Sequence, residues 1–240
     1  MKNKVERAVI FAAGLGSRLL PLTEDCPKPL IRINGKRIID TLLDAVTAAG
    51  IEEIYIVRGF LAEKFDELKG DYPTIKFIDN PYYQNANNIS SLVCAGNLIE
   101  NAYIIEGDLF LQNPSLITTY QTESNYLSIP VNATDDWCFF TDSDGVINKM
   151  SVGGENCEQM VGISYWTAKD GEKLAQCAKE LYADVENHGL YWDQVALEKY
   201  LPRFKIKTRK CSFDDVTEID TVEELRAFED YMKRGSKFET

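Results

Sequence analysis

The sequence lacks the residues and segments that several common protein classes need. It has one histidine among 240 residues, and its six cysteines are scattered without a C-x-x-C pair, so we expect reduced, structural thiols and no zinc site. No stretch approaches the about 20 apolar residues of a membrane-spanning helix, and the N-terminus leads into a strand rather than a signal-peptide core. These absences predict a cytoplasmic protein.

An excess of basic residues is also missing. Lysine and arginine together number 26 against 38 acidic residues, which gives a formal charge of −12. A nucleic-acid-binding surface would need a basic stripe, so we expect no nucleic-acid partner. An anionic ligand would have to be held by a few local cations. The length and the absence of a linker or repeat predict one domain over residues 1–240.

A glycine-containing stretch near the N-terminus is the most informative part of the chain. The apolar run at 8–13 predicts a buried strand that ends in the turn Gly14-x-Gly16, where backbone N–H groups can approach an anion. Arg18 follows within reach of a phosphate, and Lys28 stands between two prolines. The stretch is neither a dinucleotide fingerprint, because residue 19 is leucine, nor a Walker loop.

The first half of the chain alternates between strand-like and helix-like segments. This alternation predicts an α/β fold with a Rossmann-like mixed, mainly parallel sheet flanked by helices. The last expected strand ends at Asp108, where open α/β sheets bind ligands. Asp108 could instead be a turn former or a cap. The segments expected to be helical are 38–46, 61–69 and a helix from about 87 with Leu92, Val93 and Leu98 inside; the expected strands are 54–57, 75–78 and 103–107.

The second half begins with short strand-like segments, which we expect to form hairpins that cover one end of the site. Helices, one further strand and a final helix follow, and residues 234–240 are expected to fray. The expected short strands are 126–131, 137–141, 146–150 and 160–165; the expected later elements are helices at 171–185 and 192–201, a strand at 204–207 and a helix at 222–233.

Two acidic residues near the C-terminus complement Asp108. Glu218 and Asp220 are two apart, so on a strand both carboxylates face the same side. Such oxygen ligands suit Mg²⁺, which binds through one or two carboxylates and the phosphates of a substrate. The alternative is that Asp220 or Thr221 only caps the following helix.

Aromatic and acidic residues are adjacent in two places. Trp137 follows Asp135-Asp136, and Tyr191-Trp192 precedes Asp193. A quaternary ammonium group has no N–H to donate and is held by aromatic faces and nearby carboxylates. The alternative is that these aromatic residues belong to the core.

These motifs together resemble the bacterial phosphocholine cytidylyltransferases of the sugar-nucleotide pyrophosphorylase-like superfamily, over nearly the whole chain. The resemblance implies a nucleotidyltransferase fold of the GT-A-like kind, with a nucleotide-binding half at 1–125, an acceptor-binding half at 126–240 and a small hairpin lid. The matching segments are Ala12-Ala-Gly-Leu-Gly-Ser-Arg18, Pro27-Lys28, Asn87-Asn88, Gly107-Asp108, Asp136-Trp137, Leu190-Tyr-Trp-Asp193 and Glu218-Ile-Asp220.

The resemblance implies transfer of CMP from CTP to phosphocholine, giving CDP-choline and pyrophosphate, and it assigns the residues. The nucleotide would be bound by Ala12, Ala13, Gly14, Gly16, Arg18, Asn87 and Asn88. Arg18, Lys28 and Asp108 would be catalytic, and Asp108, Glu218 and Asp220 would hold Mg²⁺. Trp137, Tyr191 and Asp193 would bind the head group.

The chain departs from relatives at Glu106, where an aspartate is frequent, and at Pro29, where some have alanine. Several alternatives stay open. The same chemistry could act on 2-aminoethylphosphonate or phosphoethanolamine, the acceptor could be a sugar 1-phosphate, or the chain could be a nucleotide-binding regulatory module without catalysis. CTP rather than UTP rests on the resemblance alone.

Overall fold

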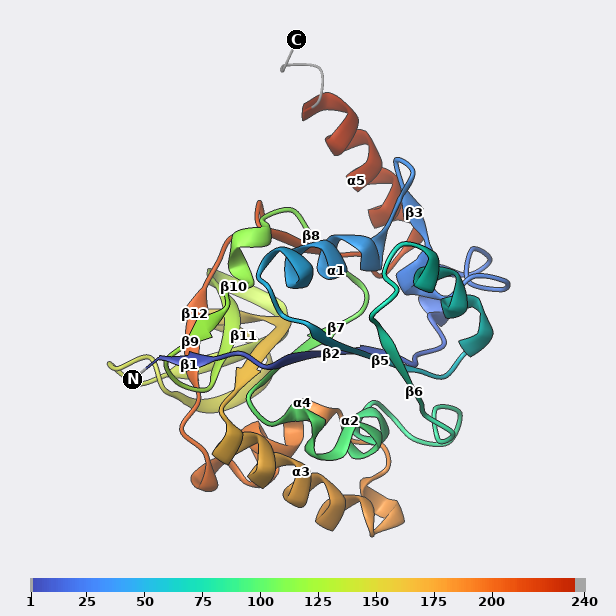
Figure 1. Ribbon diagram of the computed structural model, residues 1–240. Helices are drawn as coiled ribbons and strands as arrows, with labels where there is room; N and C mark the ends of the chain where they lie inside the picture. Colours follow the sequence, from blue (N-terminus) through green and yellow to red (C-terminus); the bar gives the residue numbers. More distant parts are fainter. Residues whose placement is uncertain (1, 236–240) are drawn as a thin grey trace.

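A seven-stranded sheet in the order β12–β10–β11–β7–β2–β5–β6 runs through the computed structural model, which describes residues 2–235 (Figure 1). Neighbouring strands from β7 to β6 are parallel, β11 is antiparallel to both β7 and β10, and β12 is parallel to β10. The predicted mixed, mainly parallel sheet is therefore confirmed. Its strands are β2 (Arg7–Ala12), β5 (Glu53–Arg58), β6 (Lys76–Asp79), β7 (Ala102–Glu106), β10 (Asn125–Thr141), β11 (Ile147–Trp166) and β12 (Lys207–Lys210).

Helices cover both faces of this sheet, so its central strands are apolar on both sides. Ala8 and Ile10 of β2 pack in the same core cluster as the first helix, whereas Val9 and Phe11 pack on the opposite side. The first face carries α1 (Ile38–Ala48) and the 3₁₀ helix η3 (Ala62–Gly70); the second carries α2 (Ile89–Ala95), α3 (Ala168–Tyr182) and α4 (Trp192–Gln194) (Figure 1).

Three two-stranded sheets complete the strand structure, and one of them shapes the site. Strand β8 (Leu109–Leu111) pairs antiparallel with β13 (Val216–Glu218), which sets Glu218 opposite Leu109 and close to Asp108. The other two pairs are β1 (Asn3–Lys4) with β9 (Tyr120–Gln121), and β3 (Arg32–Ile33) with β4 (Lys36–Arg37).

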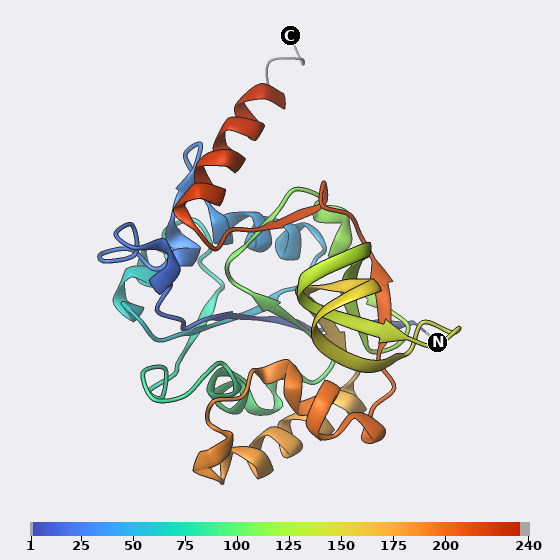
Figure 2. The same cartoon turned by 180° about the vertical axis from the view of Figure 1, so that it is seen from behind.

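The last helix, α5 (Val222–Gly235), projects away from the rest of the molecule (Figures 1 and 2). Its predicted apolar side is confirmed, because Leu225 and Phe228 are buried against Phe110 and its neighbours. The predicted end at residue 233 is two residues early. The fraying expected beyond Gly235 concerns positions outside the described residues.

The hairpin region differs from the prediction of four short strands. It consists of two long strands, β10 and β11, which belong to the seven-stranded sheet and curl together at one side of it (Figure 2). Cys138 is in register with both Ser151 and Gln159, so β11 bends around its partner. An irregularity in the pairing lets β10 continue through Thr134 and β11 through Gly153, whereas the predicted strands left both positions out.

Several other boundaries were wrong. Segment 61–69 is a 3₁₀ helix rather than an α-helix, and Leu98 falls in a separate 3₁₀ turn after α2. Helix α3 begins at Ala168, after Thr167 caps it, and α4 gives way to a π-helical turn, Val195–Lys199. The strand expected at 204–207 begins only at Lys207. Among residues 2–235, no helix is long and apolar enough to cross a membrane.

Candidate active site

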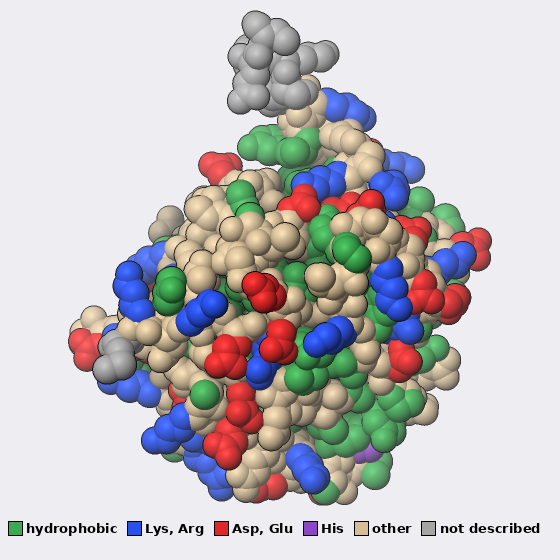
Figure 3. Space-filling view, viewed as in Figure 1, with side chains coloured by type: hydrophobic (Ala, Val, Ile, Leu, Met, Phe, Trp, Pro, Cys, Tyr) green, Lys and Arg blue, Asp and Glu red, His purple; other side chains and the backbone are tan. Residues whose placement is uncertain are grey.

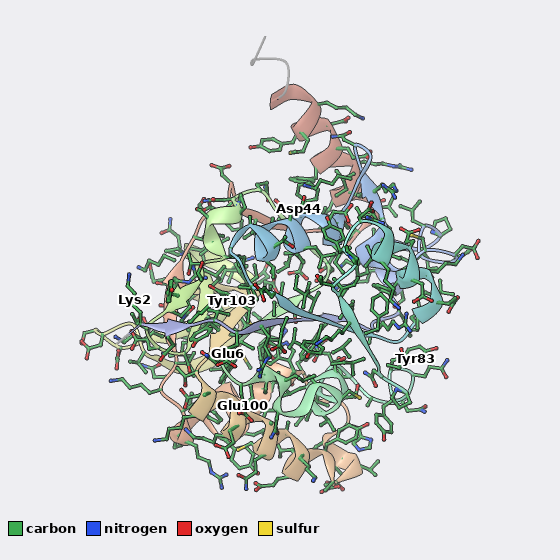
Figure 4. All side chains as sticks on the ribbon, in the orientation of Figure 1. Lys2, Glu6, Asp44, Tyr83, Glu100 and Tyr103 are labelled. Atoms are coloured by element: carbon green, nitrogen blue, oxygen red, sulfur yellow. The ribbon has the colours of Figure 1, made fainter. Side chains whose placement is uncertain are left out.

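A cavity of about 380 Å³ opens at the carboxyl end of β2. The Gly14–Gly16 turn forms one wall, and the segment between β6 and α2 forms another. Tyr83, labelled in Figure 4, belongs to this second wall. The polar and charged side chains that line the cavity are Ser17, Arg18, Lys28, Asn80, Tyr83, Asn87, Asn88, Ser90, Ser91, Asp108 and Asp220.

Two glycines are required by the close packing of this end of the sheet. Gly16 has a left-handed φ of 64°, and a Cβ there would lie 3.0 Å from Thr23 Cγ2. A Cβ on Gly107 would lie 2.9 Å from the carbonyl oxygen of Phe11, to which the Gly107 N–H donates at 2.8 Å. The second contact fixes Asp108 beside the end of β2.

Lys28 is the central cation of the site. A 3₁₀ turn, Lys28–Leu30, positions it between Pro27 and Pro29, and only 7 % of the residue is exposed. Its Nζ lies 2.7 Å from Asp108 Oδ2 and 2.6 Å from Asp220 Oδ1. Burial alone would lower the pKa of Lys28, but the charges and hydrogen bonds of the two aspartates outweigh burial and raise it. Lys28 therefore stays protonated.

Arg18 supplies a second cation at the rim of the cavity. Its Nη1 lies 2.7 Å from Asp220 Oδ2, although 69 % of the Arg18 side chain is exposed. The cavity thus has two cations in its lining, Arg18 and Lys28, and both are paired with the aspartates that line it. Over the face shown in Figure 3, basic and acidic side chains are intermixed and form no basic stripe.

The three carboxylates expected to bind a metal ion do come together. One oxygen each from Asp108, Glu218 and Asp220 lies within 4.8 Å of the others. Asp108 Oδ1 is buried and has no hydrogen-bond partner among residues 2–235. Partial desolvation by the surrounding protein, with the charges of Asp108 and Asp220, raises the pKa of Glu218 to about 8, although this side chain reaches the surface. Clustered carboxylates with an unsatisfied buried oxygen fit a hard divalent cation.

Thr221, and not Asp220, caps the last helix, α5. Its Oγ1 accepts a hydrogen bond from the Glu224 N–H, and the Glu224 carboxylate accepts from the N–H groups of Asp220 and Thr221. This reciprocal pattern is a capping box. Because Thr221 caps α5, the side chain of Asp220 is available to the cleft.

Two aromatic residues expected to bind the head group also meet. Trp137 of β10 and Tyr191 before α4 make an edge contact, with ring centroids 5.9 Å apart and 43 % of Tyr191 exposed. Trp192 instead belongs to the core: it is fully buried and stacks on Tyr126 at 5.8 Å. The core interpretation therefore holds for Trp192 only.

Asp193 points inward from α4 and is 3 % exposed. Burial, opposed by backbone hydrogen bonds, raises the pKa of Asp193 to about 7. The groups that shift it include Glu198 but no basic side chain.

Glu106 is a member of this acidic region that sequence reasoning noted only as a departure from the family pattern. Its Oε1 accepts from Trp192 Nε1 at 3.3 Å. Burial and the charges of Asp108, Glu218 and Asp193 raise the pKa of Glu106 well above its usual value. The hydroxyl of Tyr126, which the charge of Glu106 also influences, is buried and has no hydrogen-bond partner in the part of the chain that the structure describes. Glu106 lies two residues before Asp108, at the end of β7, and this position is the feature of the sequence that could have identified it as part of the site.

Asn87 and Asn88 line the cavity but also hold the segment that carries Tyr191 and Asp193. Asn88 Oδ1 accepts from the Trp192 N–H at 2.8 Å, and Asn87 Nδ2 donates to the carbonyl of Gly189 at 3.2 Å. These bonds join one wall of the cavity to the segment that carries Tyr191 and Asp193, which lie outside the lining of the cavity. Sequence spacing could not reveal them, because the partners are about 100 residues apart.

Comparisons with known proteins agree with this geometry. Residues 7–120 match the family model described as nucleotidyl transferase. The chain is 35 % identical to a 2-aminoethylphosphonate cytidylyltransferase of Lancefieldella rimae, over 92 % of this chain and 91 % of the relative. It is 30 % identical to a choline-phosphate cytidylyltransferase of Streptococcus pneumoniae, over 95 % of this chain and 98 % of that one.

A solved structure of the CTP:phosphocholine cytidylyltransferase from Streptococcus pneumoniae has the same fold. It superimposes with a TM-score of 0.88 at 30 % identity and covers 95 % of this chain and 99 % of its own. The match extends well beyond the first 120 residues, so the hairpin region belongs to the shared architecture.

Proposed function

The chain belongs to the nucleotidyl transferase family, among its cytidylyltransferases, and from this we propose that it transfers CMP from CTP to phosphocholine, giving CDP-choline and pyrophosphate. The observation that carries the proposal is the position of Lys28. It joins Asp108 and Asp220 at the inner end of a cavity lined by a glycine turn.

The cavity suits a nucleoside triphosphate. Its wall at residues 12–16 offers backbone groups, and Arg18 and Lys28 are the cations that face it. Arg18 and Lys28 would attract the negative charge of the triphosphate, although the chain as a whole carries a formal charge of −12. We assign Ala12, Ala13, Gly14, Gly16 and the Asn87-Asn88 segment to nucleotide binding.

Asp108, Glu218 and Asp220 would hold Mg²⁺, as their clustered oxygens and the orphaned Asp108 Oδ1 suggest. The bound ion would neutralise phosphate charge and align the reacting groups. It is the only cofactor that we propose.

The chemical step needs no general base. An anionic oxygen of the acceptor's own phosphate forms a bond to the α-phosphorus of CTP, and the bond from that phosphorus to the β-phosphate oxygen breaks to release pyrophosphate. Lys28 would stabilise the charge on the α-phosphoryl group, and Arg18 the departing pyrophosphate. Because both partners are anions, alignment and charge neutralisation are the main tasks of the site.

The head group would bind between Trp137, Tyr191 and Asp193. The faces of the two rings would attract a trimethylammonium group through cation–π attraction, and the buried carboxylate of Asp193 would add negative charge when it is ionised. A sugar would need neutral hydrogen-bonding groups here instead, so we do not favour a sugar 1-phosphate.

A second acceptor, 2-aminoethylphosphonate, is favoured by one observation. The buried carboxylates of Asp193 and Glu106 lie in the acceptor region and form no salt bridge within residues 2–235, and a primary ammonium could donate hydrogen bonds to them. The relative from Lancefieldella rimae carries that name.

A pyrophosphate-release assay tests these alternatives. Purified protein is incubated with Mg²⁺ and either CTP or UTP, together with phosphocholine, phosphoethanolamine, 2-aminoethylphosphonate or glucose 1-phosphate. We expect release with CTP and phosphocholine, and none with glucose 1-phosphate. Faster pyrophosphate release with 2-aminoethylphosphonate than with phosphocholine would make 2-aminoethylphosphonate the preferred acceptor. Nucleotide binding without release in any mixture would indicate a regulatory module instead.

A further inference from the structure

Two of the three carboxylates proposed to bind Mg²⁺, those of Asp108 and Asp220, are already paired with cations of the chain itself. Asp220 has one oxygen at 2.6 Å from Lys28 Nζ and the other at 2.7 Å from Arg18 Nη1. Asp108 has one oxygen at 2.7 Å from Lys28 Nζ. The Asp108 oxygen without a partner is thus the only oxygen of these two aspartates that no cation of the described chain contacts.

A metal ion and the Lys28 ammonium cannot occupy this position together. Mg²⁺ binds carboxylate oxygens at about 2.0–2.1 Å, so an ion shared by Asp108 and Asp220 would lie where Nζ now lies between them. Two like charges in one partly buried site also repel strongly. Metal binding therefore requires Lys28 to give up at least one of its two carboxylates.

Leaving those carboxylates is costly for Lys28 unless another anion replaces them. The residue is 7 % exposed, and its turn is held between Pro27 and Pro29. An uncompensated buried ammonium is strongly unfavourable. The same side chain also lines the nucleotide cavity, so phosphates bound there are within its reach.

We propose that Lys28, with Arg18 in a lesser role, is a built-in substitute for the metal ion, which keeps a divalent cation out of the site until the triphosphate binds. Phosphate oxygens then draw Lys28 away from Asp108 and Asp220 and leave their oxygens to the metal. Metal and CTP consequently bind with positive coupling, each raising the affinity for the other by the same factor. This inference rests on the metal site of the proposed function.

Arg18 contributes less than Lys28 for two reasons. It contacts one carboxylate rather than two, and its side chain is 69 % exposed. Exposed ion pairs are weak because water screens them. Removing Arg18 should therefore release Asp220 only slightly.

The test measures binding of Mn²⁺ to nucleotide-free protein, from the electron paramagnetic resonance signal of free Mn²⁺. We expect Lys28→Met to bind Mn²⁺ about tenfold more tightly than the wild type or better, the equivalent of about 1.4 kcal/mol. Lys28→Arg keeps the charge and should stay close to the wild type. Arg18→Met should gain less than about threefold. Lys64→Met is the charge-matched control on an exposed lysine away from the cavity, and it should show no change.

Equal Mn²⁺ affinity in wild type and Lys28→Met would overturn the inference. So would an equal gain in Lys64→Met, because net charge alone would then explain the effect. The double variant Lys28→Met with Asp108→Asn separates this failure from failure of the proposed function. Tight Mn²⁺ binding that survives in the double variant would place the ion elsewhere and remove the proposed metal site itself.

The wild type alone supplies a second measurement, in case Lys28→Met does not fold. Calorimetric titration gives the affinity for CTP without acceptor, first in EDTA and then with saturating Mn²⁺. We expect CTP to bind at least about tenfold more tightly with the metal. Wild-type protein that binds one Mn²⁺ at Asp108 with the same affinity with and without CTP would contradict the proposed exchange.

Discussion

At the proposed nucleotide end of the cleft Lys28 is 7 % exposed and contacts two carboxylates, whereas at the proposed acceptor end Asp193 is 3 % exposed and forms no ion pair within residues 2–235. The first charge is compensated by the chain itself, and the pKa of Lys28 rises. The second is uncompensated, and burial raises the pKa of Asp193 to about 7. The charge of Lys28 at the proposed nucleotide end is thus balanced without a ligand. At the proposed acceptor end, no cation of the described residues balances the charge of Asp193.

This difference fits the ligands proposed for the two ends. A triphosphate meets cations that can exchange one set of anionic partners for another. A cationic head group would meet carboxylates that form no ion pair within residues 2–235, so its binding would remove an electrostatic penalty. The two ends are joined by Asn87 and Asn88, whose side chains bond the segment 189–192.

The largest effect is expected at the nucleotide end. Asp108→Asn removes a carboxylate that contacts Lys28 and is proposed to hold the metal, so we expect turnover to fall by about 10³-fold. Pyrophosphate release under saturating substrates measures it. Asp144→Asn, on an exposed turn, is the control and should retain full turnover. Normal turnover in Asp108→Asn would refute the role of this carboxylate.

The uncompensated charge at the acceptor end predicts a stability that depends on pH. Because the pKa of Asp193 is raised from 3.8 to about 7, the folded state binds the proton more tightly, and this residue's contribution to stability falls as pH rises from about 4 to about 7. Asp193→Asn removes that dependence. Without ligands we expect the variant to gain about 2 kcal/mol relative to wild type between pH 5 and pH 8.

Chemical denaturation at the two pH values measures this difference. Glu198 and Glu106 also influence the charge balance around Asp193, so the comparison uses the change between pH values rather than absolute stability. Asp144→Asn should follow the wild type. A parallel pH dependence in wild type and Asp193→Asn would show that Asp193 is not the uncompensated group.

The aromatic pair should affect binding of the acceptor and leave binding of CTP unchanged. Trp137→Leu removes the ring that meets Tyr191 at 5.9 Å and with it a cation–π attraction of about 0.5–2 kcal/mol. We expect KM for phosphocholine to rise by about tenfold, with KM for CTP unchanged. A similar rise in both KM values would mean that Trp137 supports the cleft as a whole rather than the head group.

The smallest effect is expected at the link between the ends. Asn88→Ala removes the acceptor for the Trp192 N–H at 2.8 Å and should cost about 1 kcal/mol of folding stability. Because the loosened segment carries Tyr191, KM for the acceptor should rise by a few-fold. Thermal unfolding and steady-state kinetics measure both quantities. An unchanged KM in a destabilised variant would show that the two ends are independent.

The sequence predicted the proposed nucleotide end of the cleft better than the proposed acceptor end, for a physical reason. The strand, the glycine turn and Lys28 follow one another within about 20 residues, so local patterns define their geometry. Trp137 and Tyr191 come from distant elements, and only the family pattern joined them. The four short strands that were expected are two long bulged ones, because pairing across the hairpin continues through residues with poor strand propensity.

The sequence by itself determined the α/β order, the glycine turn after the first long strand and the residue types of the candidate site, because these depend on periodicity and on chemistry that neighbours in the chain share. Only the tertiary structure decided which charges are compensated. Lys28 lies between Asp108 and Asp220 across 80 and 192 residues, while Asp193 and Glu106 turn toward an interior that offers them no cation. Burial and charge pairing depend on the packing of all elements together, and no local pattern specifies them.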